Sequence, residues 1–256
     1  MVRGCASRYK SLEYGRRRLV SAFVESSRTA IELVLGADRA LLEIVSLSLR
    51  VSLAACAIGA GIGLAGGAWL AVARFPGARA LVMVLNTLLA LPSVVVGLTV
   101  YLLLSRSGPL GELGILFTPP AMVIAQTVLV LPVMMALSRQ LVADGLRDGG
   151  EQLRSMGARP MTAALLMLLH ERWAVLTILL IAFGRAVSEV GAVMIVGGNI
   201  DGVTRVMTTA IALETSKGDL PLALALGLVL LGVVALVNLA IALAQRLQPL
   251  TMAGAR

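Results

Sequence analysis

The sequence predicts an all-α integral membrane protein with about five transmembrane helices. Hydrophobic residues make up 58% of the chain, charged residues only 14%, and the mean hydropathy is +0.92. A soluble domain has about 45–50% apolar and about 25% charged residues. This chain therefore has too few polar side chains to cover a surface in water, and a bilayer must take that role.

Five apolar stretches are long enough to cross the hydrocarbon core, which takes about 20 residues of helix. They lie at 51–73, 81–104, 121–137, 173–196 and 220–244. These spans define a transmembrane domain over 41–247 and leave a short tail at 248–256. Pro92 and Pro132 fall within spans, where proline removes a backbone hydrogen bond and can mark a kink beside a cavity.

The first span is rich in glycine. Small residues three or four positions apart let membrane helices approach closely, so packing is the favoured explanation for these glycines. They are Gly59, Gly61, Gly63, Gly66 and Gly67.

Residues 1–40 form a basic tail of different character. Its apolar segment 19–35 is interrupted by Glu25, Arg28 and Glu32. A helix with such interruptions does not span a bilayer, and an amphipathic helix lying at the membrane interface fits better.

Basic loops alternate along the chain, which predicts the topology. Arginines are frequent between spans one and two, between spans three and four, and after span five, whereas Arg106 alone lies between spans two and three. Because basic loops stay in the cytoplasm, the third loop and the C-terminus are predicted inside and the N-terminus outside. The basic tail opposes an outside N-terminus, because basic segments prefer the cytoplasm. Either the tail is an extension from a start codon upstream of the natural one, or segment 19–35 re-enters the membrane.

The net charge of +8 does not indicate nucleic-acid binding. Aromatic residues are only 4% of the chain, and the arginines lie between apolar runs rather than in a basic, aromatic-rich patch. Cys5 and Cys56 have neither metal-ligand spacing nor a suggested disulfide pairing. His170 is the single histidine, so we expect no catalytic site and no metal site.

The third loop, 138–172, has a pattern of its own. Residues 151–156 have helical character, and Gly157 follows directly, as glycine does at helix ends. A helix–Gly–helix element at the cytoplasmic face is predicted to be a docking piece, the alternative being an ordinary solvated loop.

This pattern resembles the cytoplasmic signature of importer permeases with the methionine-importer type of fold. Glu151 and Gly157 have its spacing, while Gln152 and Leu153 replace two alanines and His170 stands where proline is usual. The resemblance implies a coupling helix that contacts an ATPase subunit. The implied contact residues are Glu151, Gln152, Leu153, Arg154, Gly157 and Ala158.

A second resemblance covers most of the chain. The segment 183–227, FGRAVSEVGAVMIVGGNIDGVTRVMTTAIALETSKGDLPLALALG, looks like tungstate-transport permeases and more distantly like molybdate and sulfate permeases. The stretches LPSVVVGLTVYLLLSRSGPLG and FTPPAMVIAQTVLVLP look like the same family. The resemblance implies a type I importer permease that forms a homodimer in the inner membrane. It also implies two cytoplasmic ATPase subunits and an extracytoplasmic oxyanion-binding protein as partners.

No phosphate-binding P-loop motif is present in the sequence, whose two lysines, Lys10 and Lys217, do not follow glycine in such a run. The chain is therefore expected to be no enzyme and to hold no cofactor. ATP and Mg would be bound by the partner subunit.

Arg185 and Glu189 lie within the predicted fourth span. Charges in a bilayer are costly and usually face protein or water. A spacing of four would put both on one helix face, either as a self-neutralising pair or as part of a cavity wall that offers an oxyanion bidentate donors. The candidates for a translocation pathway or gate are Pro92, Arg185, Ser188, Glu189, Gly191 and Asn199.

Three alternatives remain open at this point. A proton-coupled secondary transporter would use Glu189 as the titrating group, although no convincing internal repeat is present. A permease for sulfate or another solute would share the fold. A structural membrane subunit without transport would leave the resemblance of 183–227 unexplained.

Overall fold

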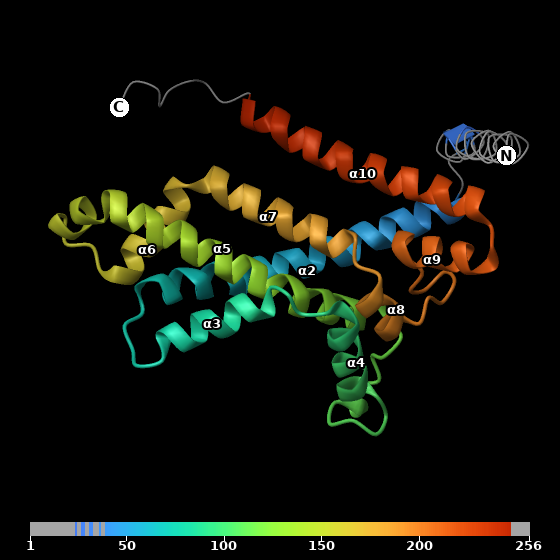
Figure 1. The fold of residues 1–256 in the computed structure, drawn as a ribbon, viewed down its shortest axis with the longest axis horizontal. Coiled ribbons are helices and arrows are strands. Elements are labelled where there is room, and N and C mark those ends of the chain that lie inside the picture. The colour runs from blue at the N-terminus through green and yellow to red at the C-terminus, as the bar shows by residue number, and fades with distance from the viewer. Residues whose placement is uncertain (1–23, 25–26, 29–30, 33–35, 37–38, 247–256) are drawn as a thin grey trace, which may run out of the picture.

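The computed structural model describes residues 24, 27–28, 31–32, 36 and 39–246, and within these the regular secondary structure is all helical, without strands. Figure 1 shows two long helices side by side, with shorter helices at both ends. The helices are α2 (Arg39–Val72), α3 (Ala78–Leu88), α4 (Ser93–Leu104), α5 (Pro119–Ser155), α6 (Pro160–His170), α7 (Arg172–Val187), α8 (Gly191–Gly197), α9 (Met207–Lys217) and α10 (Leu220–Arg246), with a 3-10 turn at Gly111–Leu113. The all-α membrane fold predicted from the sequence is confirmed.

Three helices of the described region are long and apolar enough to cross a membrane by themselves: α2, α5 and α10. Two bent pairs, α3 with α4 and α6 with α7, bring the number to as many as five, with bends of 102° and 78°. The predicted second span is therefore broken, and Pro92 stands directly before α4 at the break. Pro132 lies buried inside α5, which continues through it.

The predicted fourth span, 173–196, is wrong as a single helix. α7 ends at Val187 and α8 begins only at Gly191. The helix that combines with α7 in an apolar pair is α6, which lies in the segment predicted to be a cytoplasmic loop. The first half of that loop is also helical, because α5 continues without interruption to Ser155.

The centre of the bundle is the crossing of α2 and α5. Gly59, Gly63 and Gly67 are spaced by four residues and lie against α5. A Cβ atom on Gly63 would come within 2.8 Å of Met134 Cβ, so the absence of a side chain is what allows this approach. Ser138 Oγ donates a hydrogen bond of 3.1 Å to the Gly63 carbonyl, which fixes the crossing. Close packing, the favoured explanation for the glycines of the first span, is confirmed for Gly59, Gly63, Gly66 and Gly67 and is wrong for Gly61, where a Cβ would meet nothing within 4 Å.

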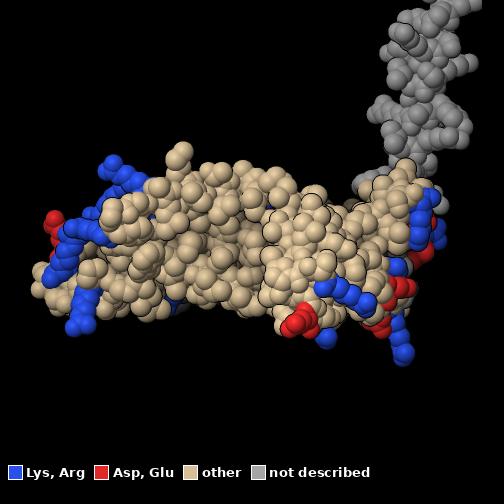
Figure 2. Space-filling view, turned by 90° about the horizontal axis from the view of Figure 1, so that it is seen from below, with Lys and Arg blue, Asp and Glu red and all other residues tan. Residues whose placement is uncertain are grey.

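Charged side chains gather at the two ends of the molecule. Figure 2 shows a broad uncharged band between them. Large apolar side chains are exposed along this band, including Ile58 and Ile62 on α2 and Leu231 and Leu236 on α10. In water this surface would be unstable, whereas in a bilayer it faces lipid or a partner's helices. A multi-pass membrane protein follows from these features.

Most loops are grouped as the topology prediction requires, whereas the loop after α4 projects away from the long axis (Figure 1). The end of α2, the start of α3 and the α5–α6 connection share one end of the molecule, and the start of α2 shares the other with α8 and α9 (Figure 1). Which end faces the cytoplasm stays a prediction. The proposed interfacial helix at 19–35 falls largely outside the described residues, although Arg28 Nε donates to Glu32 Oε1 at 2.9 Å within it.

Candidate functional site

The first candidate site is the connection between α5 and α6. Gly157 has φ +80°, a left-handed conformation that glycine adopts without strain. Its amide donates to the Arg154 carbonyl at 2.9 Å, and the Ala158 amide donates to the Leu153 carbonyl at 3.0 Å. This pair of bonds is the Schellman arrangement that ends a helix and turns the chain sharply. The predicted helix–Gly–helix element is therefore present.

Most side chains of this element point into solvent. Glu151, Gln152 and Arg154 are exposed, while Leu153 and Ala158 are half-buried. The Met156 side chain is 81% exposed and Leu169 at the end of α6 is 70% exposed. Flexible apolar side chains exposed among charges are typical of a surface that another protein covers.

Packing ties this element to the membrane helices. Ala164 of α6 is fully buried in one cluster with Val142 of α5 and Ala68 of α2. Met167 of α6 packs against Gly145 of α5. A Cβ on Gly145 would lie only 3.0 Å from Met167 Sδ, so the glycine makes this contact possible. The element that contains Gly157 is therefore packed directly against α2 and α5.

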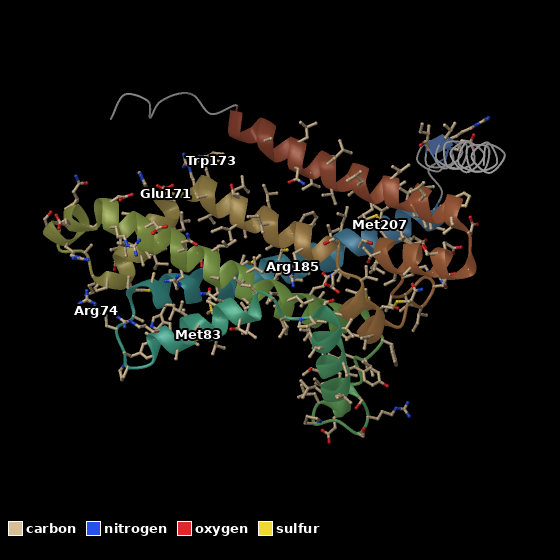
Figure 3. All side chains as sticks on the ribbon, viewed as in Figure 1. Arg74, Met83, Glu171, Trp173, Arg185 and Met207 are labelled. Atoms are coloured by element: carbon tan, nitrogen blue, oxygen red, sulfur yellow. The ribbon has the colours of Figure 1, made fainter. Side chains whose placement is uncertain are left out.

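The second candidate site is the break between α7 and α8. Arg185 lies in the last turn of α7, and Glu189 lies beyond the helix end. The prediction that both share one helix face is wrong, because the helix stops between them. No ion pair joins them: Glu189 Oε1 accepts the Ala192 amide at 3.1 Å at the start of α8, whereas Arg185 Nε is buried without a protein partner. Figure 3 places Arg185 along the long axis between Arg74, which lies at one end, and Met207.

Side chains satisfy the backbone of this break. Gln126 Nε2 of α5 donates to the Ala186 carbonyl at 2.9 Å, and Thr208 Oγ1 of α9 donates to the Glu189 carbonyl at 2.8 Å. Ser188 Oγ donates to the Arg185 carbonyl at 3.2 Å. Non-helical backbone at membrane depth is stable only where such partners or water are available. Gln126 was missed from the sequence, although a single amide in an otherwise apolar span was a usable signal.

The short helix α8 packs against α4 with almost no space between them. A Cβ on Gly191 would lie 2.9 Å from a Val94 methyl group, and one on Gly97 would lie 2.7 Å from Ala192 Cα. Because Ser93 and Val94 follow Pro92 directly, the structure brings the predicted residues Pro92 and Gly191 close together. Asn199 stands at the opposite end of α8 with φ +51°.

Three polar atoms of this region are buried without a protein hydrogen-bond partner. They are Gln126 Oε1, Arg185 Nε and Asn199 Oδ1. Unpaired buried polar groups are rare and costly, so each needs a reason. In the described residues no group of His, Cys, Asp and Glu is placed to hold a metal ion.

Known proteins resemble the chain over most of its length. No protein-family model matches it. A probable anion ABC transporter permease protein of Haloferax volcanii is 43% identical over 203 residues, which are 77% of this chain and 88% of the relative. The tungstate uptake system permease protein TupB of Peptoclostridium acidaminophilum is 42% identical over 211 residues, 81% and 91% of the two chains. A sulfate transport system permease protein CysW of Synechococcus elongatus is 28% identical over 177 residues, 66% and 62% of the two chains.

Proposed function

This chain belongs to the family of ABC transporter permeases, and we propose that it carries an oxyanion into a prokaryotic cell, with tungstate the first candidate and molybdate the next. The observation that supports this most is the identity of 42–43% to a tungstate uptake permease and an anion permease over about nine-tenths of their lengths. The sulfate permease is only 28% identical, which makes sulfate the weaker candidate. Family membership removes the proton-coupled and purely structural alternatives.

The working transporter is proposed to be an assembly in the cytoplasmic membrane. Two copies of this chain form the passage, two cytoplasmic ATPase subunits bind ATP and Mg, and an extracytoplasmic protein delivers the ion. The absence of a phosphate-cradling motif in the sequence supports a separate ATPase. The exposed element around Gly157 supports its docking at the α5–α6 end.

Uptake into liposomes tests the substrate. The permease is reconstituted with its ATPase and binding protein, and ATP-dependent accumulation of tungstate, molybdate and sulfate is measured. We expect tungstate to accumulate and to be displaced better by molybdate than by sulfate. Accumulation of sulfate without tungstate would contradict the proposal.

Gly157 tests the coupling role. Its left-handed conformation costs a side-chain residue about 1–2 kcal/mol, and asparagine less than valine. We therefore expect uptake to fall from wild type through Gly157→Asn to Gly157→Val, with the ATPase docked weakly or hydrolysing ATP without transport. Gly149→Val is the matched control, because Gly149 is helical and a Cβ there meets only the flexible end of Met167 at 3.6 Å. Equal uptake in all variants would remove the docking role.

Labelling of single cysteines tests the orientation. Ser155 is exposed at one end and Val203 is exposed at the other, whereas Thr204 is fully buried and unsuitable. A membrane-impermeant thiol reagent applied to intact cells should modify Val203→Cys and spare Ser155→Cys. The reverse pattern would invert the topology.

The break around α8 is proposed to line the pathway or form its gate. Arg185, Ser188 and Glu189 stand at the end of α7, Gly191 and Asn199 bracket α8, and Pro92 precedes α4. The unpaired donor of Arg185 supports a transient contact with the anion.

A further inference from the structure

A cavity of about 660 Å³ lies away from the α7–α8 break, between the first turns of α2 and the loop joining α8 to α9. The α2 wall contributes Glu43, Ser46 and Arg50, and the loop contributes Asp201, Gly202 and Arg205. The elements that line it lie at the end of the molecule opposite the α5–α6 connection, where α2 begins (Figure 1). In the proposed orientation this end faces the binding protein.

The two walls of the cavity are fixed to each other. Ser48 of α2 accepts the Met207 amide through Oγ at 2.8 Å, in a buried contact between residues far apart in the sequence. Ser46 and Arg50 flank Ser48 by two positions each, and Arg205 precedes Met207 by two. The loop itself is held by Thr204, whose Oγ1 donates to the Gly197 carbonyl at 2.6 Å and accepts the Ile200 amide at 2.9 Å. The cavity is therefore a built feature rather than a gap beside a free loop.

Arg205 has donors to spare. Its side chain is only 24% exposed, and its NH1 group donates to Asp201 Oδ1 at 2.7 Å. Its Nε is buried without a protein partner. A guanidinium offers five N–H donors in a planar fork that suits tetrahedral oxyanions, and Arg50 supplies a second guanidinium on the opposite wall.

The carboxylates of the cavity limit its affinity for an anion. Glu43 and Asp201 equal the two arginines in number, and both are exposed. They compete with an anion for the guanidinium donors, so an ion entering the cavity is held weakly. Weak binding suits a site that must pass its ion onward.

We propose that this cavity is a low-affinity receiving site in which Arg50 and Arg205 take the oxyanion at the extracytoplasmic mouth. The proposal rests on the proposed function and orientation. It assigns to Asp201 the role of a competing carboxylate that limits the affinity.

Protection from thiol labelling tests the site directly. Ser46→Cys is introduced after Cys5 and Cys56 are replaced by alanine, and the purified permease–ATPase complex is labelled at rising tungstate concentrations. We expect millimolar tungstate to slow the labelling, and Arg50→Gln with Arg205→Gln to abolish this protection. Arg106→Gln is the matched control, because Arg106 is exposed in the loop after α4 and does not line the cavity.

A change in the opposite direction sharpens the test. Asp201→Asn removes the ion pair with Arg205 and should reduce the tungstate concentration needed for half-protection by about two- to fivefold, the range expected when a partly exposed pair is released. If the double arginine variant folds poorly, the single variant Arg50→Gln is used instead. Arg50 lies exposed on the wall of the cavity, so its replacement should spare the fold and still weaken the protection by tungstate. Absent protection in wild type, or protection unchanged in the arginine variants, would overturn the proposal.

Two further measurements separate this proposal from other outcomes. The arginine variants should take up less tungstate at subsaturating concentration while binding the loaded binding protein with unchanged affinity. Loss of that affinity would show that the cavity takes a carboxylate of the binding protein instead, which overturns the proposal. Failure of wild-type uptake would contradict the proposed function and leave the labelling result standing, because labelling needs no transport.

Discussion

The α2–α5 crossing and the α7–α9 segment show two different ways of building a membrane interior. At the crossing, glycines on α2 let the two backbones approach, and Ser138 closes the contact. Around α8 the helix is interrupted, and side chains such as Gln126 and Thr208 bind the freed carbonyls. At the crossing the one buried unpaired polar atom among the described residues is Arg139 Nε, whereas the broken segment leaves both donors and acceptors unpaired, at Gln126, Arg185 and Asn199.

From this difference we expect the crossing to act as a scaffold and the segment around α8 to be the part that moves. Close backbone packing leaves few alternative arrangements, since a small shift loses many contacts at once. Side-chain hydrogen bonds to an interrupted backbone can be exchanged for water or for an ion at modest cost. We therefore expect stability to depend most on α2 and α5, and transport to depend most on the residues around α8.

The largest effect is expected at the crossing. Gly67→Ala places a Cβ 2.5 Å from the Met135 carbonyl oxygen and closer still to Ser138 Oγ. Because the Met135 oxygen belongs to the backbone, no change of side-chain rotamer relieves this clash. Overpacking of this kind costs about 1–3 kcal/mol, and the yield of folded protein and the thermal midpoint in detergent should both fall. Gly61→Ala is the control, because Gly61 meets nothing within 4 Å. Equal stability of the two variants would refute the crossing as the scaffold.

A smaller loss is expected from Gln126→Leu. It removes the Gln126 donor to the Ala186 carbonyl, which keeps the Glu189 amide at 3.2 Å, and it also removes the unpaired Oε1, so we expect a loss of about 0.5–1.5 kcal/mol. The same thermal measurement checks it. Thr127→Val is the neighbouring control, because the Thr127 hydroxyl binds only Val123 in its own helix. A larger loss of thermal stability for Thr127→Val than for Gln126→Leu would mean that the Gln126 side chain of α5 does not stabilise the break between α7 and α8.

The sequence predicted the scaffold better than the broken segment for a physical reason. Apolar runs reveal spans and Gly157 reveals a helix end, because both depend on local composition. The stop at Val187 has no such clear local signal: 173–196 is apolar apart from Thr177, Arg185, Ser188 and Glu189, and the break is stabilised by Gln126 and Thr208 from other helices. The cavity around Arg205 likewise has no local signal in the sequence, because its opposite wall comes from α2.

Thr208→Val should cost about 1 kcal/mol, because it removes the hydroxyl donor to the Glu189 carbonyl and adds no volume. Its consequence for transport is expected to exceed its consequence for stability, since the bond positions the chain between α7 and α8. Comparison of thermal midpoint with uptake rate measures both. Thr215→Val, whose hydroxyl binds Ile211 within α9, should change neither.

The smallest effect concerns the coupling between Arg185 and Glu189. An ion pair at membrane depth would make the two residues strongly interdependent, because removing one partner leaves the other charge uncompensated. The helix end separates them here, and Glu189 is engaged by the Ala192 amide instead. The stability changes of Arg185→Met and Glu189→Gln should therefore add to within about 0.5 kcal/mol in the double variant. A coupling of several kcal/mol would restore the self-neutralising pair. If the changes add and Arg185→Met alone lowers uptake without lowering stability, then the unpaired guanidinium acts on the ion and not on the fold.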